Sequence, residues 1–159
     1  MTDKDKRIVY LAEDGVAAVV APSPKFLAEG NTLNDVLIKS VPASGRATAD
    51  IIDVSEILSD RTFRNAWVTE KGKSIEVDLS KAKNLAKEKV RQARVSKLAE
   101  LDVAYQRADE ASDADAKAAV VVKKQTARDA PADTKISSAD SVDNLKTGME
   151  AVIKEVSDL

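Results

Sequence analysis

The chain has 159 residues, about one domain's worth at roughly 100 to 200 residues per domain, and it contains no histidine and no cysteine. This composition excludes imidazole and thiolate catalysis, zinc-finger and haem sites, and disulfides, because each requires one of the two missing residue types. The formal net charge is −2, so the whole-protein field does not attract nucleic acid or acidic membranes.

The hydrophobic residues are small on average. They make up 43% of the chain, but aromatic residues account for only 3%, and alanine is the commonest apolar type. Such a chain buries little apolar area, so we expect a thin core that gains stability from contacts with a partner. The N-terminus is polar, and nowhere are there 18 consecutive apolar residues. We therefore expect no membrane segment and a soluble protein.

The N-terminal part has the pattern of a β hairpin. Residues Ile8–Ala12 and Val16–Ala21 are rich in β-forming residues, and Asp14-Gly15 between them suits a tight turn. Pro22-Ser23-Pro24 follows, and the chain must leave the sheet there because proline has no amide hydrogen to donate.

A short helix and further strands are predicted next. Thr32 followed by Asp35 resembles a capping box, and Val41-Pro42 ends the helix, whose apolar face holds Leu33, Val36 and Leu37. The segment 44–48 is predicted to be a loop. Residues 49–54 predict another strand, and residues 66–69 and 74–77 predict a second hairpin. Together these strands would form one small antiparallel sheet covering the helix.

From Leu79 the apolar period changes from two to about 3.6, so a domain boundary is expected near Asp78. Long helices are predicted at Lys81–Glu110 and from Ser112, with Asp115 completing its cap, to Arg128, followed by a last helix at Ser141–Val156. The fold class is therefore α+β, with a small antiparallel β domain at residues 1–77, an extended helical hairpin at 78–130, and a linker with an amphipathic helix at 131–159.

The last helix carries a heptad-like seam about two heptads long. A helix of this length is marginal in water by itself, so the seam needs a partner inside the chain or outside it. The seam residues are Val142, Leu145, Met149, Val152 and Val156.

Charge is divided along the first long helix. Residues 81–97 hold seven basic and one acidic residue, whereas residues 98–115 hold six acidic and one basic residue. This order opposes the helix dipole, so another element should compensate. One interpretation is pairing within the hairpin, with Lys117, Lys123 and Lys124 beside the acidic half. A second is docking of the basic half, including Lys87, Arg91 and Arg94, on an acidic partner. Nucleic acid is a weaker candidate because the basic half has no aromatic residue for base stacking.

No pattern in the sequence predicts catalysis. Asp50 with Asp53, and Asp113 with Asp115, could in principle hold Mg²⁺ or act as acid and base, but such spacings arise by chance in a chain with 27 acidic residues. The chain has five glycines and no phosphate-binding or dinucleotide fingerprint. We therefore expect no enzyme activity, no metal and no cofactor.

The segment 60–67, Asp-Arg-Thr-Phe-Arg-Asn-Ala-Trp, concentrates two of the five aromatic residues. In a structural interpretation Asp60 caps a helical turn, and Phe63 and Trp67 are buried together. In a functional interpretation Arg61, Phe63, Arg64 and Trp67 form a partner-binding hot spot.

This octet resembles a recurrent segment in small proteins of tailed bacteriophages and prophages, where a β-rich start leads into a helical region. The resemblance covers about residues 8–131 and includes Lys89–Arg94, Tyr105–Ala108 and Arg128-Asp129, although Ala127 stands where a leucine is typical. Residues 137–159 match no part of that pattern. The layout is similar to that of phage tail fibre assembly proteins.

The resemblance implies a non-enzymatic, tail-associated structural or assembly protein of a bacteriophage. It would bind a tail fibre or another tail component through its helical arm, in the host cytoplasm during assembly or in the tail of the virion. The alternative is a capsid or neck component that cements neighbouring virion subunits. Homo-oligomerisation is a further expectation.

Overall fold

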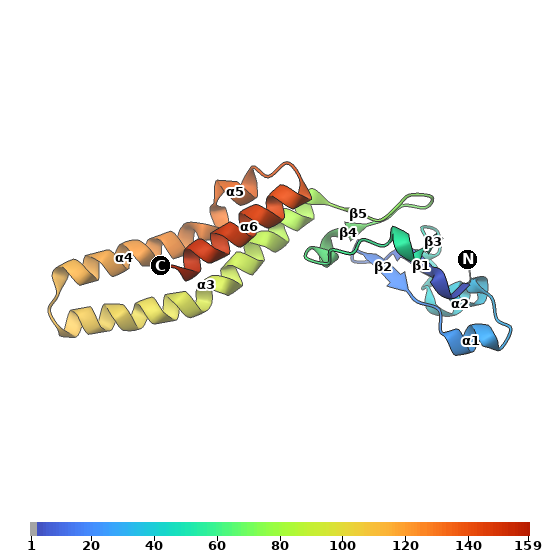
Figure 1. Ribbon diagram of the computed structural model, residues 1–159, viewed down its shortest axis with the longest axis horizontal. Coiled ribbons are helices and arrows are strands. Elements are labelled where there is room, and N and C mark those ends of the chain that lie inside the picture. The colour runs from blue at the N-terminus through green and yellow to red at the C-terminus, as the bar shows by residue number, and fades with distance from the viewer. Residues whose placement is uncertain (1–2) are drawn as a thin grey trace. The chain divides into compact units, whose positions relative to one another are not determined.

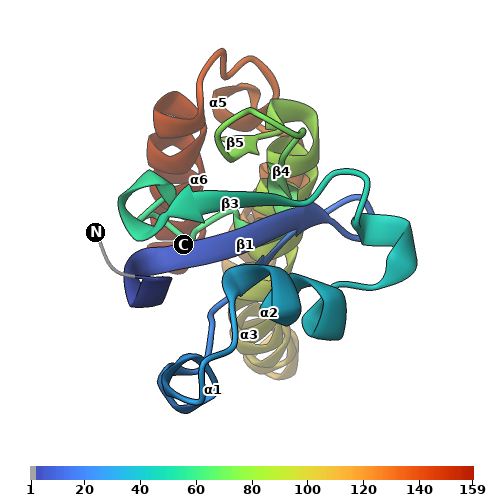
Figure 2. The same ribbon diagram turned by 90° about the vertical axis from the view of Figure 1, so that its right-hand side faces the viewer.

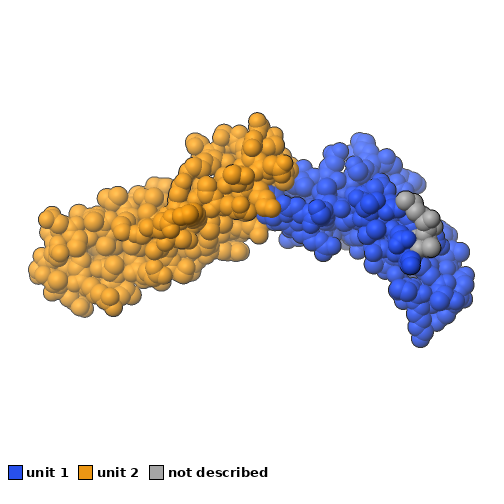
Figure 3. All heavy atoms as spheres, in the orientation of Figure 1, with its two compact units in different colours: residues 1–78 blue, residues 79–159 orange. Residues whose placement is uncertain are grey.

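A computed structural model describes residues 3–159 and divides the chain into two compact units (Figures 1 and 3). Unit 1 ends at Asp78, and unit 2 runs from Leu79 to Leu159. Unit 1 contains the strands and unit 2 contains the long helices, so the α+β class is confirmed. Residues 78–130 and 131–159, which the sequence suggested were separate parts, lie in one unit apart from Asp78 itself. Short 3-10 turns occur at Asp3–Asp5, Ala43–Gly45, Val54–Glu56, Arg64–Ala66 and Ala130–Ala132.

The main sheet of unit 1 has three antiparallel strands. The predicted hairpin forms from β1 (Lys6–Leu11) and β2 (Ala17–Val20), with Gly15 at a positive φ of 73° in the turn. The predicted third strand is β3 (Asp50–Asp53), which pairs with the other edge of β1 (Figure 2). The central strand is therefore β1.

Two short helices follow the hairpin. The first, α1 (Pro24–Ala28), begins at the second proline of the segment where the chain was expected to leave the sheet. The second, α2 (Leu33–Ser40), has the predicted capping box: Thr32 accepts from the Asp35 amide, and Asp35 accepts from the Thr32 amide at 2.7 Å.

The prediction of one continuous sheet is wrong. The second hairpin consists of β4 (Trp67–Val68) and β5 (Glu76–Val77), which pair with each other in a separate two-stranded sheet. Two 3-10 turns and irregular chain fill residues 54–66, so no tight turn brings β4 alongside β3.

The main sheet is buried on both faces because neighbouring residues of a strand point to opposite sides. Ile8 and Val9 are both 0% exposed. Ile8 packs in one cluster with Val36 of α2, whereas Val9 packs in another cluster with Trp67. Unit 1 is therefore a three-layer arrangement around β1.

Unit 2 begins with a helical hairpin. Helix α3 (Leu79–Glu110) and helix α4 (Ala114–Asp129) pack together. The cap of α4 differs from the prediction: Asp113, rather than Ser112, accepts from the Ala116 amide at 2.9 Å. Ser112 has a positive φ of 55°, so it makes the reversal, and the next residue is left to cap.

The last segment folds back on the hairpin. A short helix, α5 (Thr134–Ser137), was not predicted, and it leads to α6 (Val142–Ser157), which lies along the first half of α3 (Figure 1). Four seam residues of α6 are at most 4% exposed, namely Leu145, Met149, Val152 and Val156. Their partner is inside the chain, so the assignment of these four residues to partner binding is corrected. The fifth, Val142, is half-buried.

Candidate partner-binding surfaces

The aromatic residues of segment 60–67 belong to the core. Phe63 is 2% exposed and Trp67 is 1% exposed, and Trp67 packs against Val9 and Ile75. Because buried rings present no surface to a partner, the hot-spot interpretation is corrected for these two residues. Asp60 accepts from the Thr62 amide at 2.8 Å, so it orders the turn that precedes them.

The two arginines of the segment remain at or near the surface. Arg61 is exposed, whereas Arg64 is half-buried, with its guanidinium 4.4 Å from the centre of the Trp67 ring. This stacking is a cation–π contact and covers the outer face of the indole. Burial, followed by the positive charge of Arg61, lowers the pKa of Arg64 from its ordinary value. The guanidinium of Arg64 therefore packs on Trp67. Of the two arginines, Arg61 is the one whose side chain is exposed to a partner.

The basic half of α3 is largely used within unit 2. Arg94 donates hydrogen bonds to the carbonyls of Ala127 and Arg128, at the end of α4. Arg91 pairs with Glu88 at 3.1 Å. Lys87 is half-buried. The basic half therefore offers an acidic partner fewer unpaired basic side chains than the sequence suggested.

The acidic half of α3 pairs with α4, as the first interpretation predicted. Lys117 lies 2.5 Å from Asp109, and Lys124 lies 2.5 Å from Asp102. Both lysines also lie over the Tyr105 ring, at 5.5 and 5.0 Å. Lys123 instead donates to the carbonyl of Leu159 at the end of the chain.

The unusual charge order of α3 now has a physical cause. In the antiparallel hairpin, Arg94, near the end of the basic half, reaches the C-terminal end of α4, where the dipole is negative, and the acidic half of α3 pairs with lysines of α4. The charges oppose the dipole of their own helix but complement that of the neighbouring helix. Helix α4 therefore compensates for Arg94 and for the acidic half, whereas the first half of α3 packs along α5 and α6.

The outer part of the hairpin has a thin core and an exposed apolar surface. Beyond Val90, the described buried residues of α3 are Leu101 and Ala108, and Ala127 is the buried residue of α4. Large apolar side chains nevertheless face outward there: Val95 (64% exposed), Val103 (46%), Val121 (50%) and Val122 (66%). Exposed large apolar side chains gathered on one part of a molecule are candidates for an interaction site.

The paired carboxylates have local structural roles. Asp50 accepts from the Gly72 amide at 2.9 Å, and Asp53 accepts from Ser55, so both stabilise turns. Asp113 caps α4. Among residues 3–159, no group of three or more acidic side chains is arranged to hold a metal ion.

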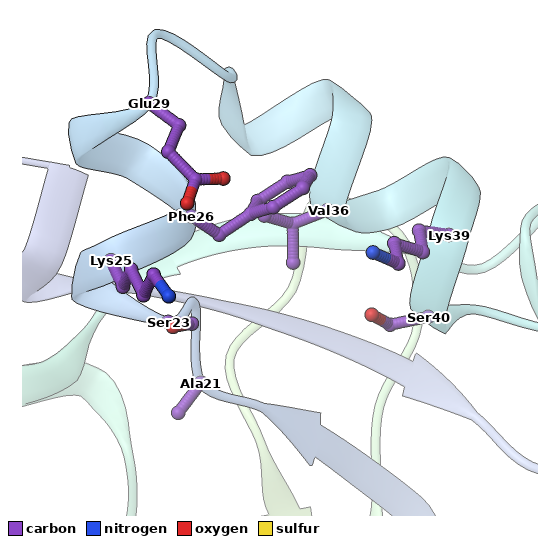
Figure 4. A pocket seen from close by; sticks show the side chains of 8 residues that line it. All are labelled: Ala21, Ser23, Lys25, Phe26, Glu29, Val36, Lys39 and Ser40. Carbon is purple, nitrogen blue, oxygen red and sulfur yellow. The ribbon is translucent and has the colours of Figure 1, made fainter.

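Unit 1 also has an open pocket of about 410 Å³ between α1 and α2 (Figure 4). The ammonium groups of Lys25 and Lys39 enter it from opposite sides, and Lys39 lies 4.8 Å from the centre of the Phe26 ring. Glu29 adds a carboxylate at the rim. The lining thus carries a small positive excess beside an aromatic surface.

No protein-family model, curated protein or solved structure matches this chain. In the part of the chain that the structure describes, no helix has both the length and the apolar character needed to cross a membrane. Among the described residues, four of the seven large apolar side chains that are exposed are valines of the hairpin.

Proposed function

We propose that this protein is a non-enzymatic, tail-associated structural or assembly protein of a bacteriophage. It binds a tail fibre or another tail component through the outer part of its helical hairpin. The phage assignment is supported by the resemblance of segment 60–67 and of the helical region to small phage proteins.

The observation that carries the binding proposal is the exposure of Val121 and Val122 on α4. Each valine buried against a partner contributes about 1.5 kcal/mol or more, whereas each one left in water contributes nothing to folding. The two-helix part of the hairpin has few buried residues of its own, so it gains more from a partner than a well-packed bundle would.

The first experiment is mass spectrometry of purified virions and of complexes captured from infected cells with the tagged chain. Recovery of a tail component with the chain is the expected result. If the chain is a virion subunit, a copy number of a few to a few dozen supports a tail location, and hundreds of copies support the capsid or neck alternative. Absence from virions together with capture of no tail component contradicts the proposal.

The second experiment tests the surface. The double variant Val121→Glu with Val122→Glu should lose capture of the tail component, because two charges would be buried without partners. Thr147→Glu with Ser157→Glu is the control, since both residues are exposed on α6, away from the valines of α4. Equal loss in both variants would assign the effect to charge or folding and not to the valines.

A further inference from the structure

The outward face of α3 carries a stripe of exposed side chains. Val95 is 64% exposed and Val103 is 46% exposed, and the small residue between them, Ala99, is also exposed. At about 100° per residue, the members of the stripe all point within about 40° of the direction of Ala99. We call this set the α3 stripe: Gln92, Val95, Ala99, Val103 and Gln106.

The α3 stripe is a palindrome in residue type and in spacing. From either end it reads Gln, Val, Ala, Val, Gln, with steps of three, four, four and three residues. A two-fold interface requires this property, because residue i of one copy meets residue j of the other while j meets i. An antiparallel second copy with the axis at Ala99 places Val95 against the Val103 of that copy and Gln92 against its Gln106.

The chemistry along such a contact is self-complementary at its centre. Ala99 has no side chain beyond Cβ, so the two helices can approach closely at the axis. The valines on each side bury apolar surface, and the glutamine amides can donate and accept hydrogen bonds between copies. A partner of unrelated sequence would not require the same residue types in both directions, so the pattern favours a second copy of this chain.

The charges flanking the stripe do not drive the association by themselves. Lys89 and Asp109 lie ten residues to either side of Ala99 and would face each other, although Asp109 already pairs with Lys117 in its own chain. Glu88 and Glu110 lie eleven residues to either side, and Arg91 and Arg107 lie eight residues to either side, so each of these pairs would bring like charges together. The valines must therefore supply most of the attraction.

We propose that the α3 stripe is an isologous interface through which two copies of this chain associate antiparallel. The stripe spans about 21 Å of helix, so the contact is smaller than the roughly 1,200 Å² of a stable complex. The dimer is therefore in a concentration-dependent equilibrium with the monomer. The proposal does not rest on the phage function, because the purified chain alone contains both surfaces.

Sedimentation velocity of the full chain over a wide concentration range tests the association. The wild-type chain should shift from monomer to dimer as its concentration rises. Val95→Glu and Val103→Glu should each raise the dimer dissociation constant by about tenfold or more, because each buries unpaired charge in a small contact. Val122→Glu is the control, since Val122 is 66% exposed but lies on α4. A monomer at every concentration, or a dimer insensitive to both α3 variants, overturns the proposal.

A single cysteine tests the position of the axis. The chain has no cysteine, so Ala99→Cys introduces the only thiol, and two such thiols at a two-fold axis lie within reach of a disulfide. Mild oxidation should convert this variant to a covalent dimer much faster than Ala118→Cys, which replaces an exposed alanine of α4. Equal rates in the two variants contradict the assigned axis.

A charge reversal tests the antiparallel register with a variant that should strengthen the dimer. Glu110→Lys would face Glu88 of the second copy, so it should tighten the dimer. Glu150→Lys makes the same change of net charge on an exposed residue of α6 and should not. Equal tightening by both would assign the effect to net charge and count against the antiparallel register.

Discussion

Arg94 stabilises a helix other than its own. From α3 it donates to the carbonyls of Ala127 and Arg128, which lie in the last turn of α4 and have no intrahelical donors. A cation at this position also complements the negative end of the α4 dipole. Arg94 was predicted to contact a partner protein, and its contact within the chain explains its charge without one.

Thr69 is a buried residue with an unpaired polar group. Its side chain is 4% exposed, and its hydroxyl has no hydrogen-bond partner among the described residues. Removing an unsatisfied buried hydroxyl while keeping the shape is favourable, so Thr69→Val should raise the free energy of unfolding by about 1 kcal/mol. Denaturant unfolding followed by fluorescence measures this change. Thr69→Ser, which keeps the hydroxyl, should show no such gain, and a loss of stability in Thr69→Val would indicate a partner for the hydroxyl.

Asp35 makes the stabilisation by the α2 capping box depend on pH. Hydrogen bonds from the Thr32 hydroxyl and amide lower the pKa of Asp35. Because the folded-state pKa lies below the unfolded value of about 4, the box stabilises the protein above that pH, and this contribution is lost as the pH falls toward the lowered pKa. The pH dependence of unfolding between about pH 5 and 2 should therefore be shallower in Asp35→Asn. Identical profiles would contradict a folded-state role for the carboxylate.

At the scale of elements, α6 and α5 complete the packing of the first half of α3. Its seam residues and Ile136 of α5 are buried against the hairpin, and Lys135 holds Glu155 at 2.8 Å. Lys83 of α3 donates to the Ser137 carbonyl at 2.8 Å and so fixes the end of α5. The outer part of the hairpin receives no third helix, which is why its valines remain exposed.

Gly148 shows why α6 and α5 can approach so closely. It lies inside α6, where alanine would ordinarily add about 1 kcal/mol of stability. A Cβ at this position would, however, lie 2.5 Å from the backbone oxygen of Lys135. Gly148→Ala should therefore lower the free energy of unfolding, by about 1–3 kcal/mol, as measured by thermal unfolding followed by circular dichroism.

The control for Gly148 is the preceding residue. Thr147 is exposed in the same helix, so Thr147→Ala should be neutral or slightly stabilising through helix propensity alone. If Gly148→Ala is also stabilising, then α5 is free to move away from α6, and the close packing is not required for stability.

At the scale of the whole molecule, the chain consists of two units with their own cores (Figure 3). The only tryptophan, Trp67, lies in the core of unit 1, whereas the long helices that dominate circular dichroism lie in unit 2. Each unit therefore has its own spectroscopic probe.

Met149→Asp tests the independence of the units. Met149 is 4% exposed, and a buried unpaired carboxylate should unfold or strongly destabilise the helices of unit 2. The circular dichroism transition should move to lower temperature, and the Trp67 fluorescence transition should stay within a few degrees of its wild-type midpoint. A matched fall in both midpoints would show that the two cores unfold as one.

The sequence by itself determined the local structure. Alternation and Asp14-Gly15 predicted the first hairpin, the Thr32 and Asp35 pair predicted the cap of α2, and the change of period near Asp78 predicted where helices begin. These features depend on neighbours within a few residues of each other, so they are visible in a single chain segment.

Only the tertiary structure decided which surfaces are buried. An apolar seam has the same sequence pattern whether it packs on its own chain or on another, so the pattern of α6 could not show that Leu145 and Val152 face α3. Arg94 and Gly148 likewise depend on elements 34 and 13 residues away along the chain. Burial arises from contacts between distant segments, and for this reason the sequence pattern alone could not separate the buried seam and aromatic pair from the exposed valines of the hairpin.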